Sequence, residues 1–197
     1  MAKMLRLAGA ACVLAGIAVQ AVWAQAGAAD AQRYAAAVTP LLDAAGGKSI
    51  GSLQPGVAVD LLGQSGAATH IAVHGWSAQN ANAAVLAAPT RRIVLVSGYS
   101  GHAPGGAAQT VNGTVYQEVT VEGWVATAAL VDDVQVVWKQ AAALFADKCG
   151  GCHALPEINS LGVNQWPAIM KTQAPNAGLD ANENALLTTY LQMTTTR

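Results

Sequence analysis

Cys149-Gly150-Gly151-Cys152-His153 is the stretch of this sequence that most strongly constrains its fold and its chemistry. Cys-x-x-Cys-His is the spacing at which haem c is attached, with two thiols forming thioether bonds and the adjacent imidazole reaching the iron. The motif predicts one covalent haem c on Cys149 and Cys152, with His153 as the proximal iron ligand. Electron transfer is therefore the leading hypothesis for the function.

Other interpretations of the cysteine pair have less support. The chain contains three cysteines, and the third, Cys12, lies in an apolar N-terminal segment. A zinc site would need further ligands, but no Cys or His follows His153. A thioredoxin-like dithiol would need a βαβ context, which the sequence does not indicate. A redox dithiol and a chance spacing remain the alternatives to haem.

The sixth iron ligand is open to more than one assignment. The two methionines downstream of the motif are Met170 and Met193. Met170 falls on a predicted helix that a loop separates from the motif, so it is the preferred distal ligand. Met193, near a Thr-rich terminus, is the alternative. A further alternative is that either methionine fills the core and leaves water or a histidine from another domain as the sixth ligand. A thioether ligand would raise the reduction potential relative to two imidazoles.

The N-terminus predicts export. Lys3 and Arg6 precede an apolar run from 7 to 22, and small residues follow at Ala24 and Ala26, as in a secretory signal. We expect a signal peptide over residues 1–24, cleaved at 24 or 26, and a linker over 25–33, which places the protein in the periplasm. A retained N-terminal anchor is the alternative. The formal net charge of −1 and the 11% of charged residues argue against nucleic-acid binding.

Residues 34–131 carry the signals of short strands. Strand-like runs at 56–62, 69–76, 91–97 and 114–124 are separated by turn-forming clusters, and Asn112-Gly113 predicts a two-residue hairpin. Trp76 and Trp124 each follow a glycine in similar strand endings of the kind found in SH3-like barrels. We interpret both as barrel core residues rather than as binding aromatics. Region 34–131 is thus predicted to be an SH3-like β domain.

Residues 132–197 are predicted to be helical. A capping pattern at 132–135 opens a helix that leads into the haem motif, a second helix starts near Asn164, and Asp180 with Glu183 opens a third. A segment of this length buries little apolar surface alone, so a covalent haem would stabilise it. The predicted fold class is therefore α+β multidomain: a small SH3-like β-barrel followed by an all-α class I-like monohaem c-type cytochrome domain.

Three stretches, 149–156, 164–167 and 190–192, carry a resemblance to a known family. The chain resembles the C-terminal, monohaem region of the pentahaem c-type cytochromes that donate electrons to trimethylamine N-oxide and dimethyl sulfoxide reductases. The resemblance implies a molybdopterin-dependent reductase as electron acceptor and an upstream quinol dehydrogenase or multihaem cytochrome as donor. It implies a redox partner of an oxidoreductase rather than an enzyme.

The sequence also departs from that family. It carries a single haem motif without the tetrahaem part, so we do not expect direct oxidation of quinol. A histidine found in some relatives between the Pro and the Trp has no counterpart in 157–163, so the ligation pattern of those relatives does not transfer. Two other functions stay open: a general periplasmic electron shuttle, and a haem-based sensor or accessory protein.

Overall fold

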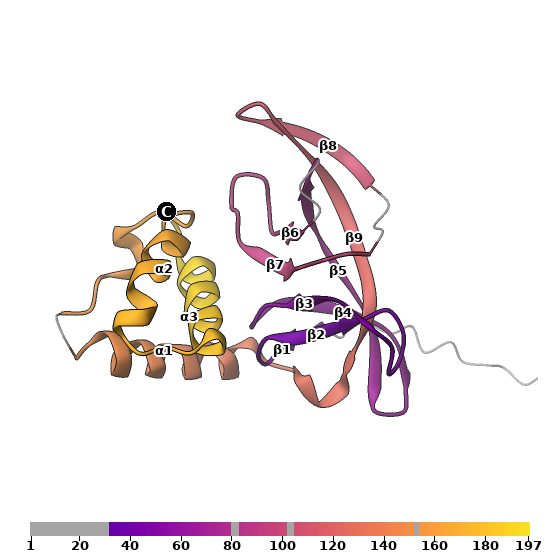
Figure 1. The fold of residues 1–197 in the computed structure, drawn as a ribbon, viewed down its shortest axis with the longest axis horizontal. Helices are drawn as coiled ribbons and strands as arrows, with labels where there is room; N and C mark the ends of the chain where they lie inside the picture. The colour runs from indigo at the N-terminus through magenta and orange to yellow at the C-terminus, as the bar shows by residue number, and fades with distance from the viewer. Residues whose placement is uncertain (1–31, 80–82, 102–104, 152–153) are drawn as a thin grey trace, which may run out of the picture.

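A computed structural model describes residues 32–79, 83–101, 105–151 and 154–197 (Figure 1). Ten strands come first: β1 Arg33–Ala35, β2 Thr39–Leu42, β3 Ser49–Leu53, β4 Ala58–Ser65, β5 Ala68–Ala78, β6 Ala84–Leu86, β7 Val94–Ser97, β8 Gly105–Val111, β9 Thr114–Ala126 and β10 Leu130–Val131. Three helices follow: α1 Val134–Cys149, α2 Trp166–Asn176 and α3 Ala181–Thr194. Short 3₁₀ turns lie at Thr127–Ala129 and Ile158–Ser160.

The strands form one sheet that closes on itself. Its order is β10-β1-β4-β5-β6-β7-β3-β2-β9-β8, and an additional pairing joins β5 to β9. That pairing completes a ring of six strands, β5-β6-β7-β3-β2-β9, while β4, β1 and β10 extend from β5, and β8 extends from β9. Closure removes free edges from the six ring strands, which protects their backbone groups from pairing with other chains.

The two longest strands determine which side chains enter the barrel. β5 and β9 pair without a register shift from Ala68 opposite Ala126 to Ala78 opposite Tyr116. Alternate side chains therefore keep to one side along the whole pair. The inward residues Ile71, Val73, Val121 and Val125 are almost fully buried and belong to the barrel core.

The same alternation shows that the predicted core position of Trp76 and Trp124 is wrong. Each indole is only half-buried and lies outside the core cluster. The inward positions belong to the preceding glycines: a Cβ built on Gly75 would lie 2.6 Å from the Leu86 carbonyl oxygen, and one on Gly123 2.6 Å from Leu41 Cδ1. Because neighbouring strand residues face opposite sides, the tryptophan after each glycine points outward.

The hairpin signal and the capping box of α3 are confirmed, whereas the predicted cap of α1 is shifted by one residue. Asn112 and Gly113 connect β8 and β9 with φ angles of 49° and 77°, the left-handed conformation that a two-residue hairpin turn needs. The capping box at Asp180 and Glu183 starts α3 with both reciprocal hydrogen bonds. The N-cap of α1 is Asp133, whose carboxylate accepts from the Gln135 amide, one residue later than the predicted pattern at 132–135.

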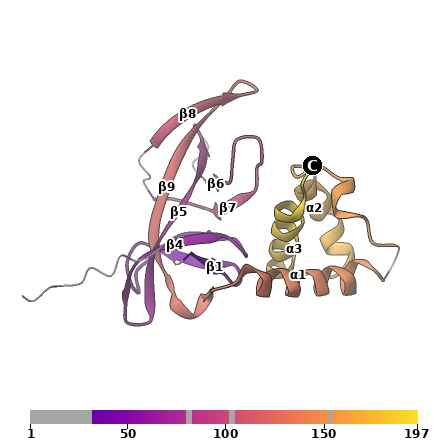
Figure 2. The same ribbon diagram turned by 180° about the vertical axis from the view of Figure 1, so that it is seen from behind.

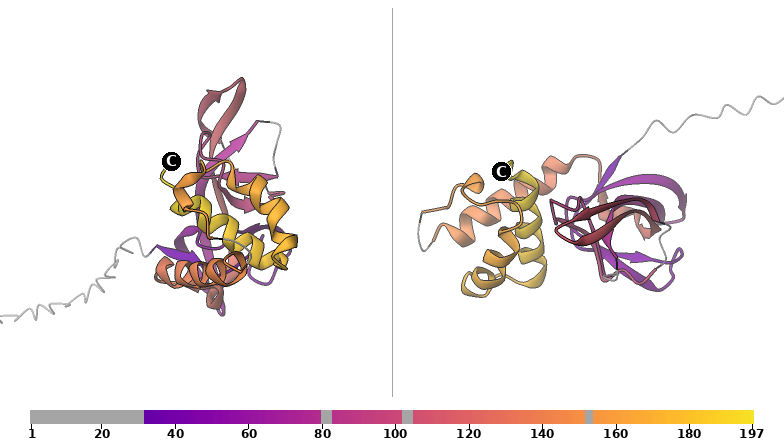
Figure 3. Two further views of the ribbon diagram at one scale, coloured as in Figure 1. Left: turned by 90° about the vertical axis from the view of Figure 1, so that its left-hand side faces the viewer. Right: turned by 90° about the horizontal axis from the view of Figure 1, so that it is seen from above.

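The helices pack on one another through their apolar faces. Nine buried residues form this helical cluster: Val137, Ala141, Phe145, Trp166, Met170, Ala174, Leu186, Leu187 and Leu191. α1 and α3 make the most extensive contact, and α2 packs on α3. Figures 1 and 2 show the three helices gathered beside the strands, on the side of β1 and β7, and the right-hand view of Figure 3 shows the same arrangement from above.

Hydrogen bonds join the C-terminal end of α3 to the loop before β7. Arg91 Nη2 donates to the carbonyl oxygens of Gln192 and Thr195 at 3.4 and 3.1 Å. Asn164, just before α2, accepts from the Arg92 amide and donates to the Thr90 carbonyl, both at 2.8 Å. Elsewhere a Cβ on Gly56 would overlap the indole of Trp138, so the turn before β4 lies directly against α1.

The predicted fold class is therefore wrong. The chain is mostly β, with a closed ring of six strands and three helices, and no class I-like all-α cytochrome domain is found in the described residues. Part of the reason is that β2, β3, β6 and β7 are short, so their pairing into a ring has no strong local signal. The other part of the reason is that hydrogen bonds join the helices to the loop before β7, so the helices do not form a separate bundle.

Replacing Gly123 by alanine is expected to lower the free energy of unfolding by about 1–3 kcal/mol, because the new methyl group would overpack the core against Leu41. Gly63→Ala is the matched control, since a Cβ there meets no atom within 4 Å, and its effect should stay within about 0.5 kcal/mol. Urea denaturation of both variants measures the difference. Equal stability of the two would contradict the inward packing of Gly123.

Candidate functional site

α1 carries the first cysteine of the motif to the edge of the helical cluster. Its buried face consists of Val137, Ala141 and Phe145, and Cys149 is its last residue. The Cys149 side chain is half-buried against this cluster. Burial raises the pKa of the Cys149 thiol, because desolvation disfavours the thiolate. Cys152 and His153 lie outside the described residues.

α2 carries the preferred distal ligand. Trp166 begins the helix, and Pro167 occupies its first turn, where the missing amide hydrogen costs no helical bond. Trp166, Met170 and Ala174 form the buried face, with Met170 only 3% exposed. The Trp166 indole donates through Nε1 to Thr195 Oγ1 at 2.8 Å, in a buried hydrogen bond. This bond fixes the start of α2 to the end of the chain.

Cys149 and Met170 line the same cavity. It has a volume of about 290 Å³ and lies between the C-terminal end of α1 and one side of α2. Its walls are predominantly apolar, and its lining residues are Phe145, Lys148, Cys149, Pro156, Trp166, Ile169, Met170, Gln173, Asn176 and Ala177. The volume lies just below the range typical of ligand pockets, which begins at about 300 Å³.

The chemistry of this cavity fits haem c. Cys149, which carries a thiol for a thioether bond, and Met170, which carries a sulfur suited to iron, both line one apolar space. Ile169 lines this cavity and is 39% exposed, so its apolar side chain is accessible for contact with a macrocycle. The described residues contain no cluster of three or more His, Cys, Asp or Glu that would hold a bare metal ion.

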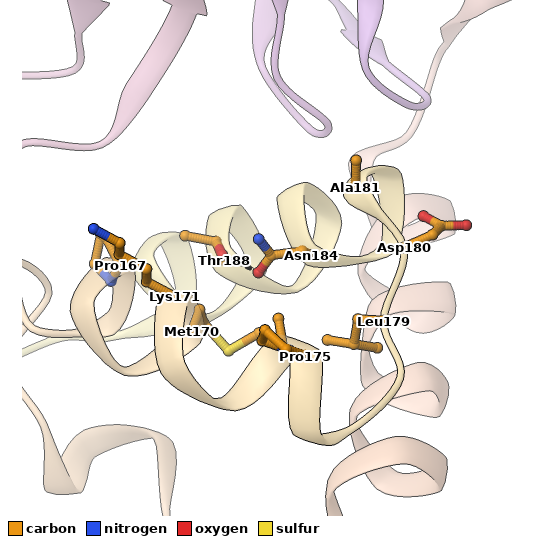
Figure 4. A pocket seen from close by; sticks show the side chains of 10 residues that line it. Pro167, Met170, Lys171, Pro175, Leu179, Asp180, Ala181, Asn184 and Thr188 are labelled. Atoms are coloured by element: carbon orange, nitrogen blue, oxygen red, sulfur yellow. Dashed lines mark hydrogen bonds between the residues drawn. The ribbon is translucent and has the colours of Figure 1, made fainter.

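A second cavity lies on the other side of α2. Its volume is about 420 Å³, and Figure 4 shows Met170 and Pro175 of α2 on one wall, with Asn184 and Thr188 of α3 on the other. Met170 lines both cavities, so its side chain separates them. The second cavity has a more polar lining, to which Lys171 and Asp180 also contribute.

The structure places the two candidate methionines in different environments. Met170 belongs to the helical cluster with Phe145 and half-buried Cys149, whereas Met193 is half-buried against the barrel core. Sequence reasoning missed Ile169 and Gln173 as lining residues. Their spacing from Trp166, at positions i+3 and i+7 on one helix, is the signal that would have found them.

No helix in the described part of the chain is long and apolar enough to cross a membrane. The predicted signal peptide, 1–24, and most of the predicted linker, 25–33, lie outside the described residues.

Two comparisons with known proteins give the same family. Residues 27–130 match the family described as the TorC third cytochrome c domain. The chain is also 27% identical over 172 residues to the cytochrome c-type protein TorC of Escherichia coli O157:H7 and to that of strain K12. The alignments cover 81% of this chain and 43% of each relative, so the chain spans less than half the length of these curated relatives. No solved structure matches the chain.

The family match extends over more than half of the chain and ends before α1 begins. The alignments to the two relatives confirm the expected resemblance to the C-terminal region of a multi-domain c-type cytochrome. A cytochrome c domain implies haem c as its prosthetic group. The chain therefore belongs to the TorC family of c-type cytochromes.

Proposed function

We propose that this chain is a periplasmic c-type cytochrome that carries one covalent haem c and transfers single electrons. The observation that carries the proposal is the apolar cavity shared by Cys149 and Met170, directly beside the single Cys-x-x-Cys-His motif. When bound, haem c supplies an iron that alternates between the ferrous and ferric states. We also propose that the chain divides into two regions, residues 34–131 and residues 132–197, and that the haem site lies in the second region.

Each residue of the site has a separate task in this proposal. Cys149 and Cys152 provide the two thioether bonds, and His153 binds the iron on the proximal side. Met170 is the proposed distal ligand, because it is buried and shares the cavity with Cys149, whereas the alternative, Met193, packs against the barrel core. A methionine ligand favours the ferrous state and raises the reduction potential relative to a second histidine.

The neighbouring side chains exclude water from the site. Phe145 and Trp166 are buried residues of the cavity wall, and the Trp166 indole is fixed by its bond to Thr195. A rigid apolar wall limits reorganisation when the iron changes charge. If His153 and Met170 both held the iron, no open position would remain for a substrate, so we propose a redox partner rather than an enzyme.

The proposed electron acceptor is a molybdopterin-dependent reductase of N-oxides or S-oxides, and the proposed donor is a quinol dehydrogenase or a multihaem cytochrome. The family assignment and the resemblance to cytochromes that serve such reductases support this pair of partners. Export through a cleaved signal peptide, or a retained N-terminal anchor, would bring the chain to the compartment of these partners.

Replacing Cys149 and Cys152 together by serine is expected to abolish covalent haem attachment, because no thiol remains to form a thioether. Mass spectrometry of protein isolated from the periplasm would show the haem adduct on the original chain and not on the variant. Cys12→Ser is the control, since Cys12 falls within the predicted signal peptide and its replacement should leave the adduct intact. Unmodified thiols at 149 and 152 in the original protein would refute the proposal.

Met170→Leu is expected to remove the near-infrared absorption band of methionine ligation from the oxidised protein and to lower the reduction potential. Leucine conserves the side-chain volume, so the helical cluster should stay folded. Met193→Leu is the matched control and should retain the band. The opposite pattern, with loss of the band in the Met193 variant only, would assign the distal position to Met193.

The proposed acceptor is tested by reoxidation of the reduced protein. Mixed anaerobically with a purified molybdopterin-dependent N-oxide reductase and trimethylamine N-oxide, the ferrous protein should be reoxidised much faster than with the N-oxide alone. Stopped-flow absorbance measures the rate, and omission of the reductase provides the control. Equal reoxidation rates with and without the reductase would exclude this acceptor. The haem assignment would be unaffected, because it is tested separately by the mass of the haem adduct.

A further inference from the structure

One outer face of the barrel carries aromatic and acidic side chains that are not part of the proposed electron-transfer site. The outward residues of β5 and β9 alternate with the buried core residues along an uninterrupted register. The β9 ribbon itself lies on the far side of the strands from α2 and α3 (Figures 1 and 2). The outer face is defined here by Asp60 of β4, His70, His74 and Trp76 of β5, and Glu118, Glu122 and Trp124 of β9.

Two tryptophans stand on the outer face because glycines occupy the adjacent inward positions. Trp124 stacks on His70 with ring centroids 4.9 Å apart and an interplanar angle of 16°. Trp76 is opposite Glu118 in the register, and both indoles are half-buried. Large aromatic side chains that remain accessible on a rigid strand pair are typical anchors of protein interfaces.

All formal charge on the outer face is negative. β4, β5, β8 and β9 are neighbours in the sheet, and together they contain Asp60, Glu118 and Glu122 but no lysine or arginine. Glu122 is 58% exposed and Asp60 41% exposed, so both carboxylates are accessible to a partner. The three carboxylates on β4 and β9 give this face a negative character that favours positively charged partners.

The polar groups of the outer face are held in place before any partner binds. His74 Nε2 lies 2.9 Å from Asp60 Oδ2, and its Nδ1 lies 2.9 Å from Thr120 Oγ1. One imidazole thus connects β4, β5 and β9. His70 makes a similar link, with Nε2 3.4 Å from Glu122 Oε2 while its ring stacks on Trp124. Preorganised side chains lose less conformational entropy on association.

We infer that the outer face docks a partner protein that presents lysine and arginine side chains. Carboxylates beside indole rings match such a partner twice, since a guanidinium or ammonium group pairs with the carboxylate and also stacks over the aromatic face. The inference is independent of the proposed electron transfer, because the outer face and the cavity of Cys149 and Met170 share no residue. It assigns the β strands a recognition role that is separate from the haem site.

The test uses the reduced, haem-loaded protein and a short synthetic peptide of alternating lysine and arginine as the probe. The indole N–H resonances of Trp76 and Trp124 should shift on titration, whereas those of Trp138 and Trp166 on the helices should not. Raising the salt concentration should weaken binding, because exposed charges are screened. A peptide of alternating glutamate and serine should leave all four resonances in place.

Paired charge variants locate the binding. Glu118→Gln with Glu122→Gln should weaken peptide binding about fivefold, the sum of two exposed ion pairs. Asp147→Asn with Glu157→Gln removes the same charge from the helical region, where both residues are exposed, and should change affinity less than about twofold. Equal weakening in the two variants, or unshifted Trp76 and Trp124 resonances, would overturn the inference. The inference would also be overturned if sedimentation showed a dimer of this chain that Trp124→Ala converts to a monomer, because the outer face would then join two copies of the chain.

Discussion

The antiparallel pairing of β5 with β9 is the constraint on which the rest of the structure depends. It closes the ring of six strands, and its register runs unbroken over the full length of β5. Because side chains alternate with a period of two, a slip by one residue would exchange buried Val73 and Val121 with polar His74 and Glu122. The same register therefore specifies the apolar core on one side and the anionic, aromatic outer face on the other.

A smaller set of polar bonds fixes the start of α2 against the C-terminal end of α3. Gln192 and Thr195 are 3% and 1% exposed, and both have hydrogen-bond partners: Gln192 Nε2 donates to the Val163 carbonyl, and Thr195 Oγ1 accepts from Trp166. An unsatisfied buried polar group costs about 1–3 kcal/mol, so these contacts select one arrangement strongly. They hold the first turn of α2, and Met170 follows one turn later on the same helix.

Local signals in the sequence predicted local features well. Asn112-Gly113 specifies its hairpin through backbone conformation alone, and Asp180 with Glu183 specifies a helix start through two short-range hydrogen bonds. The shared helix face of Trp166 and Met170 was likewise predictable, because residues four apart lie on one side of a helix. Each of these predictions needed only a few consecutive residues.

Features that depend on distant residues were not predictable in this way. The glycines at 75 and 123 suggested inward tryptophans, but the close approach of Leu86 and Leu41 gives the glycines themselves the inward positions. The bond from Arg91 to Thr195 joins residues 104 apart in sequence. That separation has a consequence for the order of folding, since closing so long a loop is entropically costly and slow. Trp166, a wall residue of the cavity beside Cys149, is held through Thr195, so this wall reaches its final position only once the C-terminal end of α3 has folded into place.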